Sequence, residues 1–248
     1  MGNFSESSLT YHLWNKWEEQ ILLRFSKVVF ISEILKLELL SRHSLPDSER
    51  NYFVLYNLID YSMYDNIAND KVKTDFLYTG SLGHWNNLKI YLDFFLSVYK
   101  KFPNSRLRII TGTSKQKILP YISEFKYNEI RNLVDIYFDV PAEQLPEKYK
   151  GCAYGLQLMN KKDSRIGVKF VEYIAAGILP IVNENVHGAA YLCHKYNIGI
   201  VLPDLLEIDT MLIQKTPLLS RNDIRYLDFR KMTDINSLDE ILKKIYMQ

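Results

Sequence analysis

The chain has 248 residues and a mass of 29.2 kDa, with 47% hydrophobic and 24% charged residues. This composition supplies enough apolar side chains for a buried core and excludes a disordered or fibrous chain. The formal net charge is only +2, which excludes the strong positive field typical of nucleic-acid-binding proteins. Any anionic ligand must therefore be bound by local groups.

The two cysteines, Cys152 and Cys193, fit neither a disulfide framework nor a zinc cluster, and we expect both to be small core residues. No uncharged apolar stretch reaches the roughly 18 residues that a membrane-spanning helix needs. The N-terminus lacks the basic and apolar regions of a signal peptide. We therefore predict a cytoplasmic protein without a transmembrane segment, and peripheral association with the inner face of the membrane stays open.

Residues 1–70 contain few regular elements. We predict helices at residues 11–25 and 33–40 and short strands at residues 28–31 and 53–55. Because one or two strands cannot form a stable sheet alone, we expect this segment to be the end of a domain whose beginning is absent. The polar stretch 65–73 then links this remnant to a second domain at residues 71–248.

From residue 71 onwards, apolar strands alternate with amphipathic helices. We predict strands at residues 76–79, 106–111, 133–138, 153–159, 179–182 and 199–202. Helices are predicted at residues 88–102, 115–125, 143–150, 168–176 and 189–196, with a last helix capped by Ser237 and Glu240. This alternation is typical of a parallel sheet with helices on both faces. The sequence therefore predicts an α/β chain with a Rossmann-like domain preceded by a partial second α/β domain.

A loop with two glycines follows the first strand of this domain. It consists of Gly80, Ser81, Leu82 and Gly83 and leads into a helix. Such a loop can present backbone amides to a phosphate at the positive end of the helix. The spacing is not the GxGxxG fingerprint, and a tight turn without a ligand explains both glycines about as well.

A second segment of interest is the helix that begins at Gly167 and ends at Gly177, on which Lys169 and Glu172 share one face. One interpretation is an exposed ion pair without a function. The other uses its position, because the helix begins at the carboxyl end of a strand, where open α/β sheets bind ligands. There, Lys169 would neutralise a diphosphate and Glu172 would accept hydrogen bonds from ribose hydroxyls.

The strand, the Gly-Ser-Leu-Gly loop, the long helix and the later run Lys-Phe-Val-Glu-Tyr-Ile-Ala-Ala-Gly-Ile-Leu-Pro-Ile-Val together resemble the nucleotide-binding domain of retaining GT-B glycosyltransferases of family 4. The resemblance covers residues 76–202, and residues 27–33 and 55–60 are similar to the last strand and exit segment of the family's other domain. It implies transfer of a sugar from a nucleoside diphosphate, with UDP-sugar as the first choice, to a saccharide or lipid-linked acceptor. Glu172 matches the ribose-binding glutamate, and residues 80–83 match the loop that meets the diphosphate.

The chain departs from the family in three respects. Ser164 replaces a glutamate that helps to bind the donor sugar. Ser81 and Asn86 replace an arginine and a lysine, so Arg165 and Lys169 become the candidate phosphate-binding cations. We also expect the front of the other domain, which should carry the acceptor site, to be missing. The motifs that remain also occur together in polysaccharide-assembling members.

Further candidates for contact with the donor sugar or base are Asp139, Val140, Ser164, Gly167 and His187. A surface or capping role is the alternative for His187. The other histidines show no metal-ligand spacing, so we expect no metal and no cofactor beyond the donor.

These observations favour a glycosyltransferase for which no catalytic side chain can be named. The alternative is a non-catalytic nucleotide-binding half, or one subunit of a split glycosyltransferase whose partner chain supplies the missing strands. A sugar epimerase of the same fold is a third interpretation, but the motifs show no acid/base residues for it.

Overall fold

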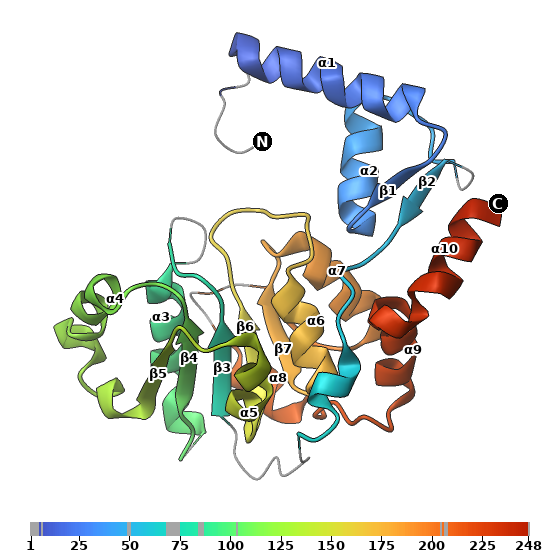
Figure 1. Cartoon of the computed structure of the whole chain (residues 1–248). Helices are drawn as coiled ribbons and strands as arrows, with labels where there is room; N and C mark the ends of the chain where they lie inside the picture. Colours follow the sequence, from blue (N-terminus) through green and yellow to red (C-terminus); the bar gives the residue numbers. More distant parts are fainter. Residues whose placement is uncertain are drawn as a thin grey trace.

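The computed structural model describes residues 5, 7–48, 51–67, 75–83, 87–102, 104–203, 205 and 208–247. Figure 1 shows a small N-terminal unit above a larger α/β domain. The N-terminal unit consists of α1 (Leu9–Arg24), β1 (Val28–Phe30), α2 (Glu33–Arg42) and β2 (Tyr52–Val54). Its two strands pair in parallel, and every predicted element of this segment is present.

A parallel sheet of six strands forms the centre of the larger domain. The strands are β3 (Asp75–Thr79), β4 (Leu107–Thr111), β5 (Val134–Phe138), β6 (Cys152–Gln157), β7 (Leu179–Asn183) and β8 (Ile200–Leu202). Their order across the sheet is β5-β4-β3-β6-β7-β8, and all pairings are parallel. The predicted strands and α/β fold class are confirmed. The order of the strands reverses between β3 and β6, which creates a topological switch point.

Helices cover both faces of this sheet (Figure 1). They are α3 (Leu88–Val98), α4 (Lys115–Ile122), α5 (Leu145–Tyr149), α6 (Val168–Ala175) and α7 (His187–Tyr196). α3 and α4 are shorter than predicted, because residues 99–101 and 125–127 form separate 3₁₀ turns. α7 begins two residues earlier than predicted, so His187 is its first residue.

The C-terminal region forms three helices, α8 (Thr210–Lys215), α9 (Ile224–Thr233) and α10 (Leu238–Met247). Of these three helices, the sequence predicted only α10. α9 was missed because its pattern is weakly amphipathic: Ile224 and Leu227 are exposed, whereas Tyr226 and Phe229 are buried. The side chain of Asp223 caps α9 by accepting a hydrogen bond from the amide of Arg225.

The segment that joins the two parts of the chain is bonded to the C-terminal helices. Ile59 forms an isolated parallel bridge with Asp234, and the amide of Ile59 donates to the carbonyl of Thr233 over 2.9 Å. The hydroxyls of Tyr61 and Thr233 lie 2.7 Å apart. These contacts fix the connection before the predicted linker, most of which (residues 68–73) lies outside the described residues together with Asn86.

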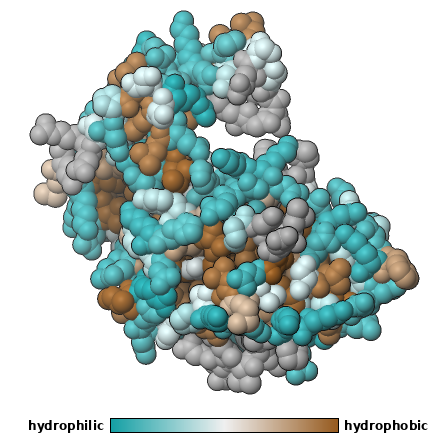
Figure 2. Space-filling model, turned by 180° about the vertical axis from the view of Figure 1, so that it is seen from behind, coloured by the Kyte–Doolittle hydropathy of each residue, from teal (hydrophilic) through white to brown (hydrophobic). Residues whose placement is uncertain are grey.

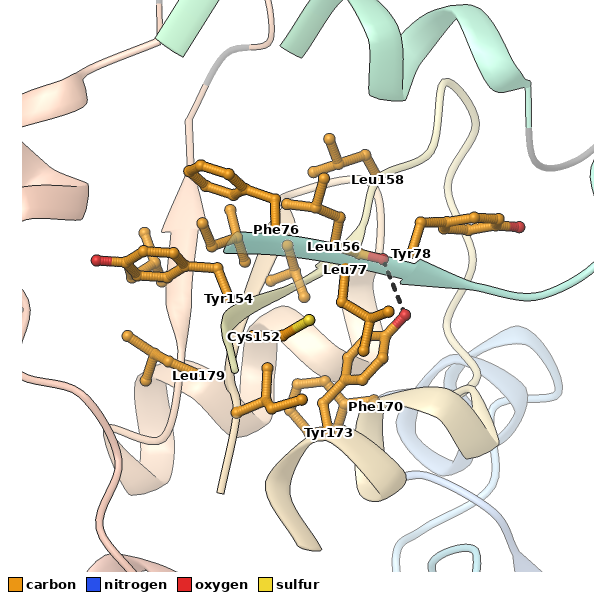
Figure 3. Packing of buried hydrophobic residues seen from close by; sticks show 14 of the residues in the cluster. Phe76, Leu77, Tyr78, Cys152, Tyr154, Leu156, Leu158, Phe170, Tyr173 and Leu179 are labelled. Atoms are coloured by element: carbon orange, nitrogen blue, oxygen red, sulfur yellow. Dashed lines mark hydrogen bonds between the residues drawn. The ribbon is translucent and has the colours of Figure 1, made fainter. Parts of the chain in front are cut away.

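The side chains of β3 alternate between the two faces of the sheet. Phe76 packs against Phe94 and Phe95 of α3, with ring centroids 5.5 and 5.9 Å away, and stacks on Tyr154 of β6 at 5.1 Å. Figure 3 shows Leu77 on the opposite side, toward α6. All five residues of β3 are buried, as a central strand between two helix layers requires.

Both cysteines are buried and unpaired, which confirms the predicted core role. Burial raises the pKa of the Cys152 thiol to about 12. Within the described part of the chain, no helix is long and apolar enough to cross a membrane, and no group of three or more His, Cys, Asp or Glu side chains could hold a metal ion.

Gly155 of β6 lies directly beneath the ring of Tyr173 of α6. A Cβ atom at Gly155 would lie 2.4 Å from the ring, whereas one at Gly83 would meet no atom within 4 Å. We expect Gly155→Ala to lower the free energy of unfolding by about 2 kcal/mol, because the helix must move away from the strand. Gly83→Ala should change it by less than about 0.5 kcal/mol. Urea denaturation measures both, and equal values for the two variants would contradict this packing.

Candidate functional site

The candidate site lies where β3 and β6 separate. Their pairing ends at Leu77 and Gly155, and beyond this point Tyr173 stands between the two strands. Its hydroxyl accepts a hydrogen bond from the amide of Thr79 over 2.9 Å. The same hydroxyl donates to the carbonyl of Leu156 at 3.5 Å (Figure 3). The Tyr173 hydroxyl thus provides hydrogen-bond partners for one backbone group of each strand beyond the end of their pairing. Such partners are needed because buried backbone N–H and C=O groups are costly to leave unpaired.

The loop after β3 has a fixed conformation. Gly80 has a φ of +151°, a value that side chains with a Cβ rarely adopt, and a Cβ there would lie 3.0 Å from the hydroxyl of Tyr78. That hydroxyl donates to the carbonyl of Ser81 over 3.0 Å. Thr113, after β4, accepts from the amide of Leu82 at 2.8 Å and donates to its carbonyl at 3.0 Å.

These hydrogen bonds limit what the loop can offer to a ligand. The amide of Gly80 donates to the carbonyl of Ile110 over 3.0 Å, and the amide of Leu82 donates to Thr113. The sequence suggested a loop with amides available to a diphosphate, but in this conformation two of them already bond to the protein. Because these two amides are not available, the binding of a phosphate beside this loop would depend mainly on a nearby cation.

Such a cation borders a hollow at the switch point. The hollow has a volume of about 190 Å³, and its lining comes from the ends of β3 and β4, from the segment after β5, and from α5 and α6. Gly80, Ser81, Val140 and Lys169 are the predicted site residues that the structure brings together around it. Leu82 and Gly83 instead line a larger hollow of about 680 Å³ between the loop, α3 and α4.

Lys169 and Glu172 lie on one face of α6, as the sequence predicted, and form an ion pair there. The Lys169 Nζ lies 2.8 Å from each carboxylate oxygen of Glu172. The pair is partly buried, because the side chain of Glu172 is only 10% exposed and that of Lys169 is 33% exposed. This degree of burial argues against a merely solvated surface pair, since a charged side chain leaves water only when it has strong partners.

Glu172 has a further partner that the sequence did not reveal. The hydroxyl of Tyr149, in α5, donates to the Glu172 Oε2 over 2.7 Å. Burial and then the charge of Glu172 raise the pKa of Tyr149, so its hydroxyl stays protonated and acts as a donor. Glu172 is therefore held by one cation and one neutral donor.

Ser164 and His187 belong to a different group of contacts, between the two parts of the chain. The hydroxyl of Ser164 donates to the Glu38 Oε2 of α2 over 2.5 Å, and the hydroxyl of Ser32 donates to the carbonyl of Ser164. The His187 Nδ1 lies 3.5 Å from the Glu38 Oε1. The position at which the resemblance places a donor-sugar glutamate thus holds a serine bonded to a glutamate of α2.

Arg165 lies beside this group but is paired locally. Its Nε and one terminal nitrogen each donate to the carboxylate of Asp163 over 2.8 Å. The side chain of Arg165 is 60% exposed. Burial tends to raise the pKa of Asp163, but hydrogen bonds from Arg165 outweigh this effect and lower it, so the carboxylate stays ionised. Arg165 is not among the residues that line the hollow, whereas Lys169 is.

Two further predicted residues lie close to these groups. Asp139 follows β5 with a φ of +50°, and its Oδ1 lies 3.7 Å from the position that a Cβ on Gly112 would occupy. Gly167 precedes α6 without a side-chain cap. A Cβ there would lie 2.6 Å from the Gln157 Nε2, so the glycine allows the end of β6 to approach the start of α6.

No protein-family model and no curated protein sequence matches the chain. Solved structures do match it. HepE from Anabaena in complex with UDP superimposes with a TM-score of 0.74 at 14% identity, covering 98% of this chain and 69% of that protein. Sucrose-phosphate synthase from Thermosynechococcus elongatus superimposes with a TM-score of 0.70 at 14% identity, covering 98% of this chain and 63% of that protein. The lipopolysaccharide outer core galactosyltransferase WaaB superimposes with a TM-score of 0.66 at 17% identity, covering 90% of this chain and 62% of that protein.

These neighbours are GT-B glycosyltransferases. The chain shares their fold. Its large domain corresponds to their Rossmann-like architecture, which confirms the predicted fold class at this level. The chain spans 62–69% of the length of the three structures.

The bond between Tyr149 and Glu172 can be tested through stability. Tyr149→Phe removes a donor from a buried carboxylate, so we expect the free energy of unfolding to fall by about 1.5 kcal/mol or more. Tyr154→Phe is the matched control, because that buried hydroxyl lies 3.5 Å from an uncharged carbonyl. We expect the control to cost about 0.5 kcal/mol. Guanidinium denaturation measures both. Equal losses of unfolding free energy in the two variants would contradict a stabilising hydrogen bond from Tyr149 to the carboxylate of Glu172.

Proposed function

We propose that the chain binds a nucleotide sugar, with UDP-sugar as the first choice, and is the donor-binding part of a retaining glycosyltransferase of family 4. The observation that carries the proposal is the partly buried pair of Lys169 and Glu172 beside the hollow at the switch point. The GT-B fold supports it, as does the determination of HepE with UDP-glucose and with UDP.

In this proposal Lys169 approaches the diphosphate, and Glu172 accepts hydrogen bonds from the ribose. The start of α6 supplies additional positive potential, because the amides at a helix N-terminus favour anions. Stabilisation of the leaving diphosphate by these groups would assist departure of the nucleotide. We further propose a cytoplasmic enzyme that acts in the assembly of a surface polysaccharide or another glycan.

Isothermal titration calorimetry with UDP tests this function. We expect the parent chain to bind UDP and Glu172→Gln to weaken binding by about 1–3 kcal/mol, because the ribose hydroxyls lose a charged acceptor. Glu147→Gln is the control, since Glu147 is 67% exposed and pairs with Lys150. No binding of UDP by the parent, or equal affinity in Glu172→Gln and the parent, would remove this pair from a nucleotide site.

The role of Lys169 is separated from that of Glu172 by the choice of ligand. Lys169→Gln should weaken the binding of UDP far more than the binding of uridine, because uridine lacks the phosphates that the cation neutralises. Arg165→Gln should have a smaller effect on UDP, since Arg165 does not line the hollow and Lys169 does. Equal losses for UDP and uridine in Lys169→Gln would contradict the proposed role.

The alternative function is a non-catalytic half or one subunit of a split glycosyltransferase, and the surface of α1 favours it. Figure 2 shows hydrophobic side chains on the surface of the N-terminal unit, at the top of the view. Those of α1 and its end that are 47–75% exposed are Leu9, Leu13, Trp14, Trp17, Ile21, Leu23 and Phe25. Most of them repeat every three or four residues along the helix, so they form one apolar face that a further protein surface could cover.

For this reason we expect the chain alone not to transfer sugar at an appreciable rate. Holding donor and acceptor together in one closed cleft can supply roughly 7–11 kcal/mol of the barrier, and the donor domain provides only one wall of it. The purified chain should be incubated with nucleotide sugars and saccharide or lipid-linked acceptors, with mass spectrometry of the products and light scattering for the assembly state. Robust transfer by the monomer would exclude the split arrangement.

A further inference from the structure

Glu38 joins the N-terminal unit to the loop that leads into α6. Ser32 caps α2 and also donates to the carbonyl of Ser164, while Glu38, on the same helix, accepts from the hydroxyl of Ser164 over 2.5 Å. The side-chain amide of Asn57 donates to the carbonyl of Ile166 over 2.6 Å. Three side chains from outside the larger domain thus hold one short loop, and Glu38 is the only charged one among them.

This loop leads directly into α6, the helix that carries Lys169 and Glu172. Ser164 precedes Lys169 by only five residues, and Gly167 lies between them, directly before α6. The carboxyl ends of β3 and β6 lie on the side of the sheet that faces the N-terminal unit (Figure 1). A ligand whose phosphates lie at Lys169 can therefore extend its next group toward Glu38.

The carboxylate of Glu38 has unused capacity to accept hydrogen bonds. An ionised carboxylate offers about four lone-pair positions, and Ser164 occupies one of them. The His187 Nδ1, at 3.5 Å, is beyond the usual hydrogen-bond distance. The side chain of Glu38 remains 42% exposed, so an incoming ligand can reach it.

The charge of Glu38 indicates which part of the ligand it meets. A carboxylate repels phosphate, so this place is unsuited to the diphosphate. It suits an uncharged group that is rich in hydroxyl donors, because bonds from hydroxyls to a carboxylate are short and strong. The sugar of a nucleotide sugar is such a group.

We infer that Glu38 accepts hydrogen bonds from hydroxyl groups of the donor's sugar and thereby contributes to sugar specificity from the N-terminal unit. The inference rests on the proposed function, because it requires the nucleotide to bind at Lys169 and Glu172. Ser164 orients the carboxylate, so the sugar is recognised across the boundary between the two parts of the chain.

The test compares UDP with UDP-glucose, UDP-galactose and UDP-N-acetylglucosamine by calorimetry on the parent and on Glu38→Gln. For the UDP-sugar that the parent binds most tightly, we expect the dissociation constant to rise on the order of tenfold in Glu38→Gln. The dissociation constant for UDP should stay within about twofold of the parent value, which also shows that the variant is folded.

Glu184→Gln is the matched control. Glu184 also faces a histidine, since its carboxylate lies 3.4 Å from His194, and its side chain is 54% exposed. We expect this variant to bind all four ligands like the parent. Equal losses of UDP and UDP-sugar in Glu38→Gln, or no loss of any UDP-sugar, would overturn the inference. A parent that fails to bind UDP would instead refute the proposed function.

Discussion

The contact of Tyr173 with β3 and β6 is the interaction on which the geometry of the site depends. The two strands belong to opposite halves of the sheet and stop pairing at Leu77 and Gly155. Tyr173 packs its ring on Gly155 and places its hydroxyl between the amide of Thr79 and the carbonyl of Leu156. One side chain therefore holds α6 against the sheet where the strand order reverses.

The functional groups follow from this contact. Glu172 directly precedes Tyr173, and Lys169 lies one helical turn before it, so fixing Tyr173 also fixes the ion pair at the carboxyl end of β3. Tyr149 adds a neutral donor that keeps the carboxylate bonded in a buried environment. The start of α6 is held from the other side by Asn57, so both ends of the segment that carries the pair are constrained.

The sequence predicted those features of the fold and the site that depend on the local pattern of residues. Apolar periodicity predicts the buried strands and the helix from Val168. The spacing of Lys169 and Glu172 along that helix places them on one face, where they can pair. The sequence did not predict the bonds of Tyr149 to Glu172 and of Glu38 to Ser164, because these residues lie 23 and 126 positions apart and only the tertiary fold brings them together. For the same reason the sequence could not show that the amide of Leu82 donates a hydrogen bond to Thr113.

A crystal structure of the chain with UDP tests the proposed site most directly. We expect density for the diphosphate in the hollow beside Lys169, bordered by Gly80 and Ser81, with the ribose hydroxyls within hydrogen-bond distance of Glu172. Density for UDP at another place, such as the larger hollow between α3 and α4, with the pair of Lys169 and Glu172 untouched, would contradict it.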